Sequence, residues 1–260
     1  MARMCHPERG FPQMILKYVV MAIIALAVAG GSANAKDDGN PVGRQHSDDA
    51  LLDLPLHVMA AKPTRDTLAI IYSGDGGWQE LDTKVSAYLQ KEGIPVIGLD
   101  SLRYFWTERT AAETAKDLGR IIDHYTRRFN VQHVILVGYS FGADVMPASY
   151  KRLTPQQRSK VRQISLLAMS HEVDYVVSLR GWLGLLTEGK GGDPAVDVKT
   201  INPDMVQCIY GTEDDHDNAC PSLRGTSVQV IGMPGGHHFD GDYEKLAQQI
   251  IAGPKPHVRK

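Results

Sequence analysis

The sequence predicts an α/β fold with a mostly parallel, doubly wound sheet. Two observations predict it: the strand-like runs are short and continuously apolar, as in strands buried on both faces, and helix-like segments of ten or more residues separate them. Helices of that length between strands favour parallel pairing with right-handed crossovers. Of the 260 residues, 43% are hydrophobic and 22% are charged, as in a globular protein with a sizeable core. The net charge of −2 gives no basic field, so we expect no nucleic-acid partner.

Residues 1–35 are expected to be a signal peptide. A positively charged start precedes the apolar run 19–29, and the small-residue site Ala33-Asn34-Ala35 follows it. This three-part pattern is typical of secretory signals, and we predict cleavage after Ala35. An uncleaved membrane anchor is the alternative, but the run is short beside the ~20 residues that span a bilayer. We therefore expect an exported protein, with a flexible N-terminal arm at 36–50 and one domain at 51–260.

The elements of this domain follow one another in strand–helix order. Continuous apolar runs are typical of strands buried on both faces, and they predict strands at 68–72, 95–100, 133–138, 163–169, 206–211 and 228–233. Helical spacing of apolar residues predicts helices at 81–91, 110–129, 143–153 and 243–251. The segment 171–198 breaks this order directly after a strand and is rich in glycine, so we expect it to form a small lid over the site.

Ser140 is the predicted nucleophile. It lies in Gly138-Tyr139-Ser140-Phe141-Gly142, a G-x-S-x-G motif between a predicted strand and a predicted helix. Such a motif holds the serine on a sharp, strained turn, and the flanking glycines remove the clashes that larger side chains would make. The turn aims the start of the helix at the serine, which makes the Phe141 N–H an oxyanion donor. A purely structural glycine turn is the alternative.

A nucleophilic serine needs a base and an orienting acid, and in this context the chain order is serine, acid, histidine. Acids follow the fifth predicted strand, and we favour Asp214, with Asp215 and Glu213 as alternatives. Two histidines follow the sixth predicted strand, and we favour His237 over His238. Ligands bind beyond the carboxyl ends of the strands in open α/β sheets, so we expect these residues to meet there.

The loop "YSGDGGW", residues 72–78, is a candidate for the second half of an oxyanion hole. Its glycines allow backbone N–H groups to converge, and we expect the N–H of Asp75 or Gly76 to complement that of Phe141. A plain glycine turn is the alternative. The loop lacks the G-K-[ST] ending of a phosphate-binding loop.

The segment 208–220 carries acids, a histidine and two cysteines. Its spacing matches neither an H-E-x-x-H motif nor an EF-hand loop, so we expect no metal and no cofactor. Cys208 and Cys220 are expected to form a disulfide, because two cysteines in an exported protein pair more often than they stay free.

Together these residues resemble the α/β-hydrolase superfamily and, more narrowly, the VirJ/AcvB family of exported bacterial virulence proteins. The stretches that carry the resemblance are "YSGDGGW" (72–78), "SLRYFW" (101–106), "GYSFGAD" (138–144), "GWLG" (181–184), "YGTEDD" (210–215) and "GGHHFDGDY" (235–243). The resemblance implies an α/β-hydrolase fold and a periplasmic serine hydrolase with Ser140, Asp214 and His237 as its triad. It also implies a link to type IV secretion and hydrolysis of the aminoacyl ester of lysyl-phosphatidylglycerol.

Candidate substrate contacts lie on three segments. Glu172 and Asp174, together with Asp75, are candidates to face the ammonium of a cationic lipid. Trp106 and Trp182 are candidates to contact the substrate or a membrane surface, where indole rings favour the interface. Ordinary packing of these aromatic residues is the alternative.

We therefore expect an esterase that cleaves a lipid or small-molecule ester and has secretion-system proteins as partners. The alternative from another class is a non-catalytic periplasmic binding or assembly factor for a type IV secretion system. An acyltransferase or thioesterase would use the same site. The serine–acid–histidine order favours an enzyme.

Overall fold

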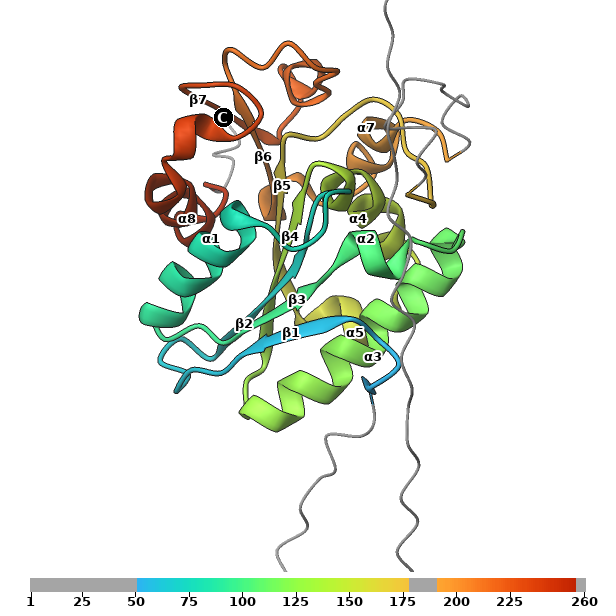
Figure 1. The fold of residues 1–260 in the computed structure, drawn as a ribbon, viewed down its shortest axis with the longest axis vertical. Helices are drawn as coiled ribbons and strands as arrows, with labels where there is room; N and C mark the ends of the chain where they lie inside the picture. Colours follow the sequence, from blue (N-terminus) through green and yellow to red (C-terminus); the bar gives the residue numbers. More distant parts are fainter. Residues whose placement is uncertain (1–50, 178–190, 256–260) are drawn as a thin grey trace, which may run out of the picture. The chain divides into compact units, whose positions relative to one another are not determined.

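A seven-stranded sheet organises the part of the chain that the structure, a computed structural model, describes: residues 51–177 and 191–255 (Figure 1). The strand order is β1-β3-β2-β4-β5-β6-β7. The strands are β1 (Leu56–Met59), β2 (Thr67–Tyr72), β3 (Val96–Leu99), β4 (His133–Tyr139), β5 (Val161–Leu167), β6 (Val206–Gly211) and β7 (Gln229–Met233). All neighbouring pairs are parallel except β1, which pairs antiparallel with β3. The mostly parallel fold class is thus confirmed.

Helices cover both faces of this sheet (Figure 1). On one face α1 (Glu80–Lys91) packs against α8 (Tyr243–Ala252). On the other face α3 (Ala111–Phe129) packs against α4 (Phe141–Lys151), α5 (Pro155–Lys160) contacts α3, and α7 (Pro194–Val198) contacts α4. The short elements are α2 (Ser101–Tyr104), η2 (Pro203–Met205), η3 (Cys220–Leu223) and η4 (Phe239–Gly241).

Alternation along the strands divides the core into two layers. On β2, Leu68, Ile70 and Tyr72 join the cluster under α3 and α4, whereas Ala69 and Ile71 join the cluster under α1 and α8. Successive side chains of a strand point to opposite faces, so a strand buried on both sides is apolar throughout.

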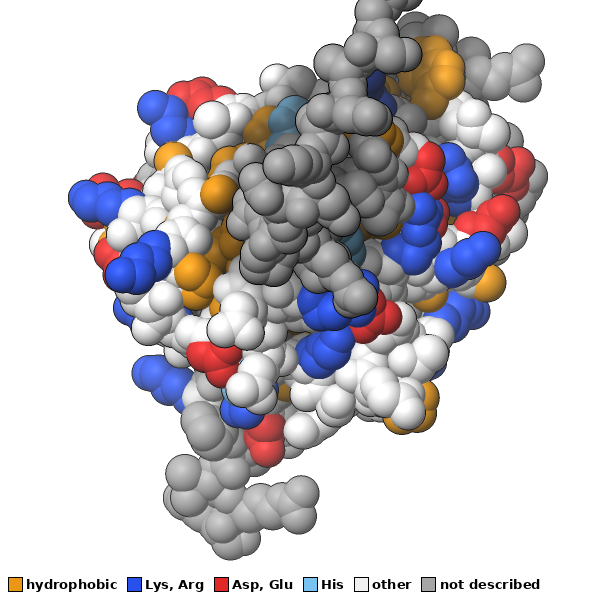
Figure 2. All heavy atoms as spheres, turned by 90° about the horizontal axis from the view of Figure 1, so that it is seen from below, with side chains coloured by type: hydrophobic (Ala, Val, Ile, Leu, Met, Phe, Trp, Pro, Cys, Tyr) orange, Lys and Arg blue, Asp and Glu red, His pale blue; other side chains and the backbone are white. Residues whose placement is uncertain are grey.

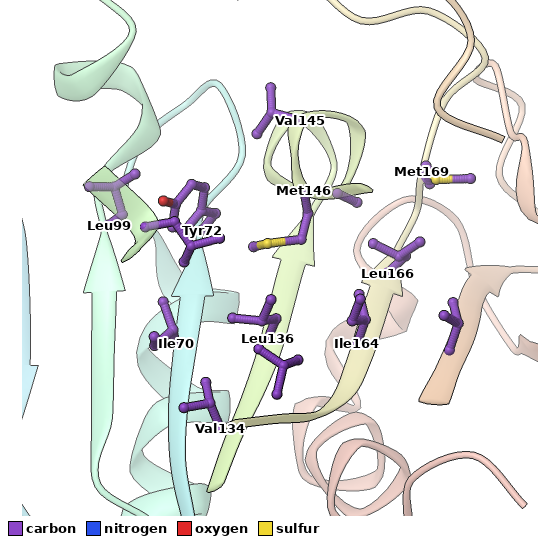
Figure 3. Packing of buried hydrophobic residues seen from close by; sticks show 14 of the residues in the cluster. Ile70, Tyr72, Leu99, Val134, Leu136, Val145, Met146, Ile164, Leu166 and Met169 are labelled. Atoms are coloured by element: carbon purple, nitrogen blue, oxygen red, sulfur yellow. The ribbon is translucent and has the colours of Figure 1, made fainter. Parts of the chain in front are cut away.

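The layer under α4 is drawn in Figure 3. There Leu136 of β4 and Ile164 of β5 point to the same side of the sheet as Ile70, below Met146 of α4. Close packing at this level fixes the start of α4 relative to the ends of β2, β4 and β5, and these ends carry the site.

Helix α3 begins and ends at residues whose side chains or backbone preferences favour a helix boundary. Thr110 accepts a hydrogen bond from the Glu113 N–H, and the Glu113 side chain accepts one from the Thr110 N–H, which is a capping box at the start of α3. At the other end Asn130 adopts a left-handed conformation with φ of +51°. Asparagine tolerates that conformation and commonly ends helices.

Each predicted strand and helix is present, with ends that differ by a few residues. Helix α4 begins at Phe141, two residues before its predicted start, because the turn at Ser140 leads directly into it. The edge strand β1 and the short helices α2, α5 and α7 were absent from the expectation. The expected signal peptide (1–35), flexible arm (36–50) and central lid residues (178–190) lie outside the described residues.

Charges of both signs are mixed on the surface of the protein. On the side seen in Figure 2, Lys and Arg side chains lie beside Asp and Glu side chains. Ion pairs such as Arg120–Asp53 and Lys160–Asp123 link opposite charges.

Among the helices of the described ranges, none is both long enough and apolar enough to cross a membrane.

Candidate active site

Ser140 stands at the turn between β4 and α4 in a strained backbone conformation. Its φ is +51° and its ψ is −122°, values that residues with a side chain rarely adopt. The Ser140 N–H donates to the Leu167 carbonyl at 2.8 Å, and the Ser140 carbonyl accepts from the Ala143 N–H at 2.7 Å. These two bonds tie the turn to the end of β5 and to the first turn of α4.

The two glycines of the motif are required by close backbone contacts. A Cβ on Gly138 would lie 2.4 Å from the Gly142 carbonyl oxygen. A Cβ on Gly142 would lie 2.2 Å from the Tyr72 carbonyl oxygen at the end of β2. Neither backbone oxygen is free to move without disturbing the sheet or the helix, so only glycine allows this turn to fit against its neighbours.

His237 lies in the loop after β7, between Ser140 and Asp214. Its Nε2 is 2.9 Å from Ser140 Oγ, and its Nδ1 is 2.8 Å from Asp214 Oδ2. His238 instead places its Nδ1 2.9 Å from the hydroxyl of Tyr139. Of the two histidines weighed from the sequence, His237 is therefore the one that the structure brings to the serine.

Asp214 is the acid that the structure brings to His237. Its side chain is 1% exposed, whereas that of Asp215 is 95% exposed and points to solvent. Burial alone would raise the pKa of Asp214, but hydrogen bonds from His237 and His216 outweigh burial and hold this pKa below its usual range. The carboxylate therefore stays ionised beside His237, and an ionised acid can stabilise an imidazolium there.

The loop that carries Asp214 is fixed by backbone bonds and by a disulfide. The Thr212 N–H donates to the Met233 carbonyl at 2.8 Å, and the Glu213 N–H donates to the Gly235 carbonyl at 2.9 Å. The expected pair Cys208 and Cys220 forms a disulfide across the loop, with the two Cα atoms 5.4 Å apart. The loop with the acid and the loop with the histidine are thus held side by side.

A cavity of about 500 Å³ opens at Ser140, a size typical of small-ligand sites. Asp75 and Gly76 both line it, and the adjacent Gly74 is close enough that a Cβ there would lie 3.6 Å from Ser140 Cβ. Phe141, as the first residue of α4, has an N–H that needs no partner within the helix. Among the described residues, the cavity is lined by Gly74, Asp75, Gly76, Gly77, Gln79, Glu80, Leu81, Tyr139, Ser140, His237, His238 and Tyr243.

The other expected substrate contacts are placed differently. Trp106 is 64% exposed and Glu172 is exposed, and neither is in the described lining of the Ser140 cavity. Asp174 lines a separate cavity together with Arg109 and Arg152. Trp182 lies outside the described residues. Among the expected acids, only Asp75 lines the cavity at the serine, and Glu80, which the sequence interpretation missed, lines it as well.

His216, the histidine of segment 208–220, was considered from the sequence only as a possible metal ligand, and its contact with the predicted acid was not foreseen. Its Nδ1 lies 3.0 Å from Asp214 Oδ1, the carboxylate oxygen that His237 does not use. Asp214, His216 and His237 each offer a potential metal-ligand atom, all within 4.8 Å of one another. Both imidazoles already engage the carboxylate through Nδ1, and ordinary hydrogen bonds account for these distances.

Comparison with known protein families decides the family. The family described as "Bacterial virulence protein (VirJ)" matches residues 66–257, which is most of the chain. The chain belongs to the VirJ family. A search of curated protein sequences returns no match.

Several solved structures that match this chain are named as esterases or hydrolases. A lipase-esterase related protein from Clostridium acetobutylicum superposes with a TM-score of 0.56 at 14% identity, over 77% of this chain and 99% of that one. Est1E from Butyrivibrio proteoclasticus, solved with ferulic acid, gives 0.54 at 16% identity, over 76% and 92%. An alpha-beta serine hydrolase homologue from Coxiella burnetii gives 0.52 at 18%, over 76% and 90%. At these identities the likeness shows the α/β-hydrolase fold.

Proposed function

We propose that this VirJ-family protein is a serine hydrolase that cleaves carboxylic esters. The observation that carries the proposal is the unbroken series of hydrogen bonds from Ser140 Oγ through His237 to Asp214, in a cavity open to a ligand. Base and acid lie at the distances that nucleophile activation requires, and the strained turn exposes the hydroxyl.

In the proposed reaction Ser140 Oγ attacks the ester carbonyl while His237 Nε2 takes the hydroxyl proton. Asp214 holds the imidazole by its Nδ1–H and stabilises the imidazolium that forms. The Phe141 N–H, with the N–H of Asp75 or Gly76, holds the oxyanion of the tetrahedral intermediate. His237 then returns its proton to the leaving alcohol, and water, activated by His237, releases the acyl group from Ser140.

We further propose that the ester joins a lysyl group to phosphatidylglycerol. The motifs that the chain shares with the VirJ/AcvB family support this substrate. The charges at the site support it too, because the described lining of the Ser140 cavity holds the acids Asp75 and Glu80 and no Lys or Arg. Carboxylates near the reacting carbonyl favour a cationic acyl group over an anionic one.

We propose a periplasmic location, which the proposed substrate and the N-terminal segment both support. The signal-like pattern in residues 1–35 supports export to the periplasm, where the outer leaflet of the inner membrane presents its lipids. The exposed ring of Trp106 supports peripheral contact with that surface. We propose a role in type IV secretion, with secretion-system proteins as partners, on the family resemblance.

The experiment measures free lysine released from vesicles that contain lysyl-phosphatidylglycerol, with the purified protein and with Ser140→Ala. We expect release by the wild type and none by Ser140→Ala. A second comparison uses Glu80→Gln, which should raise KM for the lysyl ester more than for a neutral butyrate ester. Hydrolysis of the neutral ester without lysine release would keep the esterase and contradict the lipid substrate. If neither ester is hydrolysed, the proposed enzyme is wrong.

A further inference from the structure

His216 makes a second, independent set of contacts with the triad acid. Its backbone N–H donates to Asp214 Oδ1 at 3.2 Å, and its ring Nδ1 lies 3.0 Å from the same oxygen. The other oxygen, Oδ2, is 2.8 Å from His237 Nδ1. The carboxylate is therefore bonded at both ends, by one histidine on each side.

The position of His216 in the chain explains this double contact. It stands two residues after Asp214, in the loop that the disulfide closes. An aspartate at this spacing accepts the N–H of the second following residue. The ring of His216 then lies beside that of His237, with their centroids 5.2 Å apart. Asp215, whose Oδ1 is 3.4 Å from His216 Nδ1, is the other charged group against the ring.

Rotation of a carboxylate about its Cβ–Cγ bond is soft, because that torsion is broad rather than confined to staggered wells. A hydrogen bond on Oδ1 limits this rotation and keeps Oδ2 directed at His237. The backbone N–H of His216 supplies one such bond at 3.2 Å, and the ring supplies a closer one at 3.0 Å. Orienting groups of this kind support catalysis through the residues they hold.

We propose that His216 is a positioning residue of the triad, whose ring fixes the orientation of the Asp214 carboxylate toward His237. The inference rests on the proposed serine hydrolase, since it assigns His216 a part in activating Ser140. His216 touches no reacting atom in this account and acts only through Asp214.

The test compares His216→Leu with His216→Asn in the full protein. Leucine fills a similar space without a donor, whereas the Nδ2 of asparagine stands near the place of the histidine Nδ1 and can donate to Oδ1. The rate constant for covalent labelling by a fluorophosphonate, and kcat and KM for a neutral ester, are measured for each. We expect His216→Leu to lower the labelling rate and kcat about tenfold with KM unchanged, which corresponds to about 1.4 kcal/mol. His216→Asn should stay within about twofold of the wild type.

Controls separate this inference from the function on which it rests. Asp215→Asn removes a neighbouring charge and should label at the wild-type rate. If His216→Leu is destabilised, as thermal unfolding would show, His216→Ala replaces it. Labelling that depends on Ser140 but is equally fast with leucine, or equally slow with leucine and asparagine, would overturn the role of His216 alone. Absence of Ser140-dependent labelling in the wild type would overturn both proposals.

Discussion

The serine and the acid of the site are held in place by different means. Ser140 is held by backbone: a positive φ, a bond to the Leu167 carbonyl, and glycines where no Cβ fits. Asp214 is held largely by side chains: two histidines on its carboxylate and a disulfide around its loop. The contrast implies that changes at the turn should disturb folding and activity together, whereas a change of the Asp214 side chain itself should reduce activity more than it reduces stability.

The largest effect is expected from Asp214→Asn. The amide presents its own NH₂ or a weaker acceptor to His237, so the imidazole loses both its orientation and the charge that stabilises it. By analogy with other serine hydrolases we expect kcat to fall by about 10⁴-fold. The free energy of unfolding in urea should fall by less than in a variant of the turn, because the variant loses only the stabilisation that the lowered pKa of Asp214 reflects. The comparison of the two regions would be wrong if this variant unfolded as readily as a variant of the turn; the exposed Asp215→Asn is the matched control.

Gly142→Ala tests the other region. The new Cβ would lie 2.2 Å from the Tyr72 oxygen and 2.7 Å from the Ser73 oxygen, and both are backbone atoms that cannot rotate away. We expect a loss of about 3 kcal/mol in the free energy of unfolding, together with most of the activity. Gly236→Ala is the control, since the nearest atom to its Cβ would be 3.8 Å away. Equal urea midpoints for the two variants would contradict the account of the turn.

Removal of the disulfide tests how the loop that carries Asp214 is held in place. Cys208 and Cys220 are 12 residues apart, so opening this loop gives the unfolded chain more freedom and should lower stability by about 2–3 kcal/mol. Because Asp214 and His216 lie between the two cysteines, the double variant Cys208→Ala/Cys220→Ala should also label several-fold more slowly at Ser140. Calorimetry and fluorophosphonate labelling measure the two effects. Unchanged labelling would show that backbone bonds alone hold Asp214.

The smallest expected effect is a pH dependence of stability caused by Asp144, a buried acid in α4. Burial raises the pKa of Asp144 in α4 to about 8, although the Ser170 N–H, which donates to it at 2.8 Å, lowers this pKa in part. The folded protein thus holds a proton that the unfolded chain has lost above about pH 4, and stability falls as pH rises from about 4 to 8.

Asp144→Asn does not titrate and should lack this decline. Its free energy of unfolding is measured in urea at pH 6 and pH 7 and compared with that of the wild type. The difference, variant minus wild type, should increase by on the order of 1 kcal/mol per pH unit. Parallel curves for the two proteins would mean that Asp144 does not keep its proton in the folded state.

Much of the fold was predictable because the pattern was repetitive. Strands such as β2 and β4 are buried on both faces and read as continuous apolar runs, so their period is unambiguous. Strand β1 was not predicted because its four residues, Leu56–Met59, lie at the sheet edge, are partly buried or, at Val58, exposed, and include a histidine. Short edge strands carry little pattern of their own.

The candidate site was predictable in type more than in detail. The order of serine, acid and histidine followed from the residues after three predicted strands. The sequence could favour Asp214 over Asp215, and His237 over His238, but it could not decide between the members of each pair. His237 and His238 differ only in where the backbone after Gly236 directs each ring, and tertiary structure sets that direction. The contact of His216 with Asp214 had a local signal, the two-residue spacing, which also fits an ordinary exposed loop.

The site of fluorophosphonate labelling shows directly whether Ser140 is the nucleophile. Trypsin should release residues 129–151 as one peptide, in which Ser140 and Ser149 are the serines. We expect one adduct, on Ser140, that forms in the wild type at neutral pH, is lost in Ser140→Ala, and forms far more slowly in His237→Ala. An adduct on another residue, or labelling that is equal in the wild type and Ser140→Ala, would contradict this expectation.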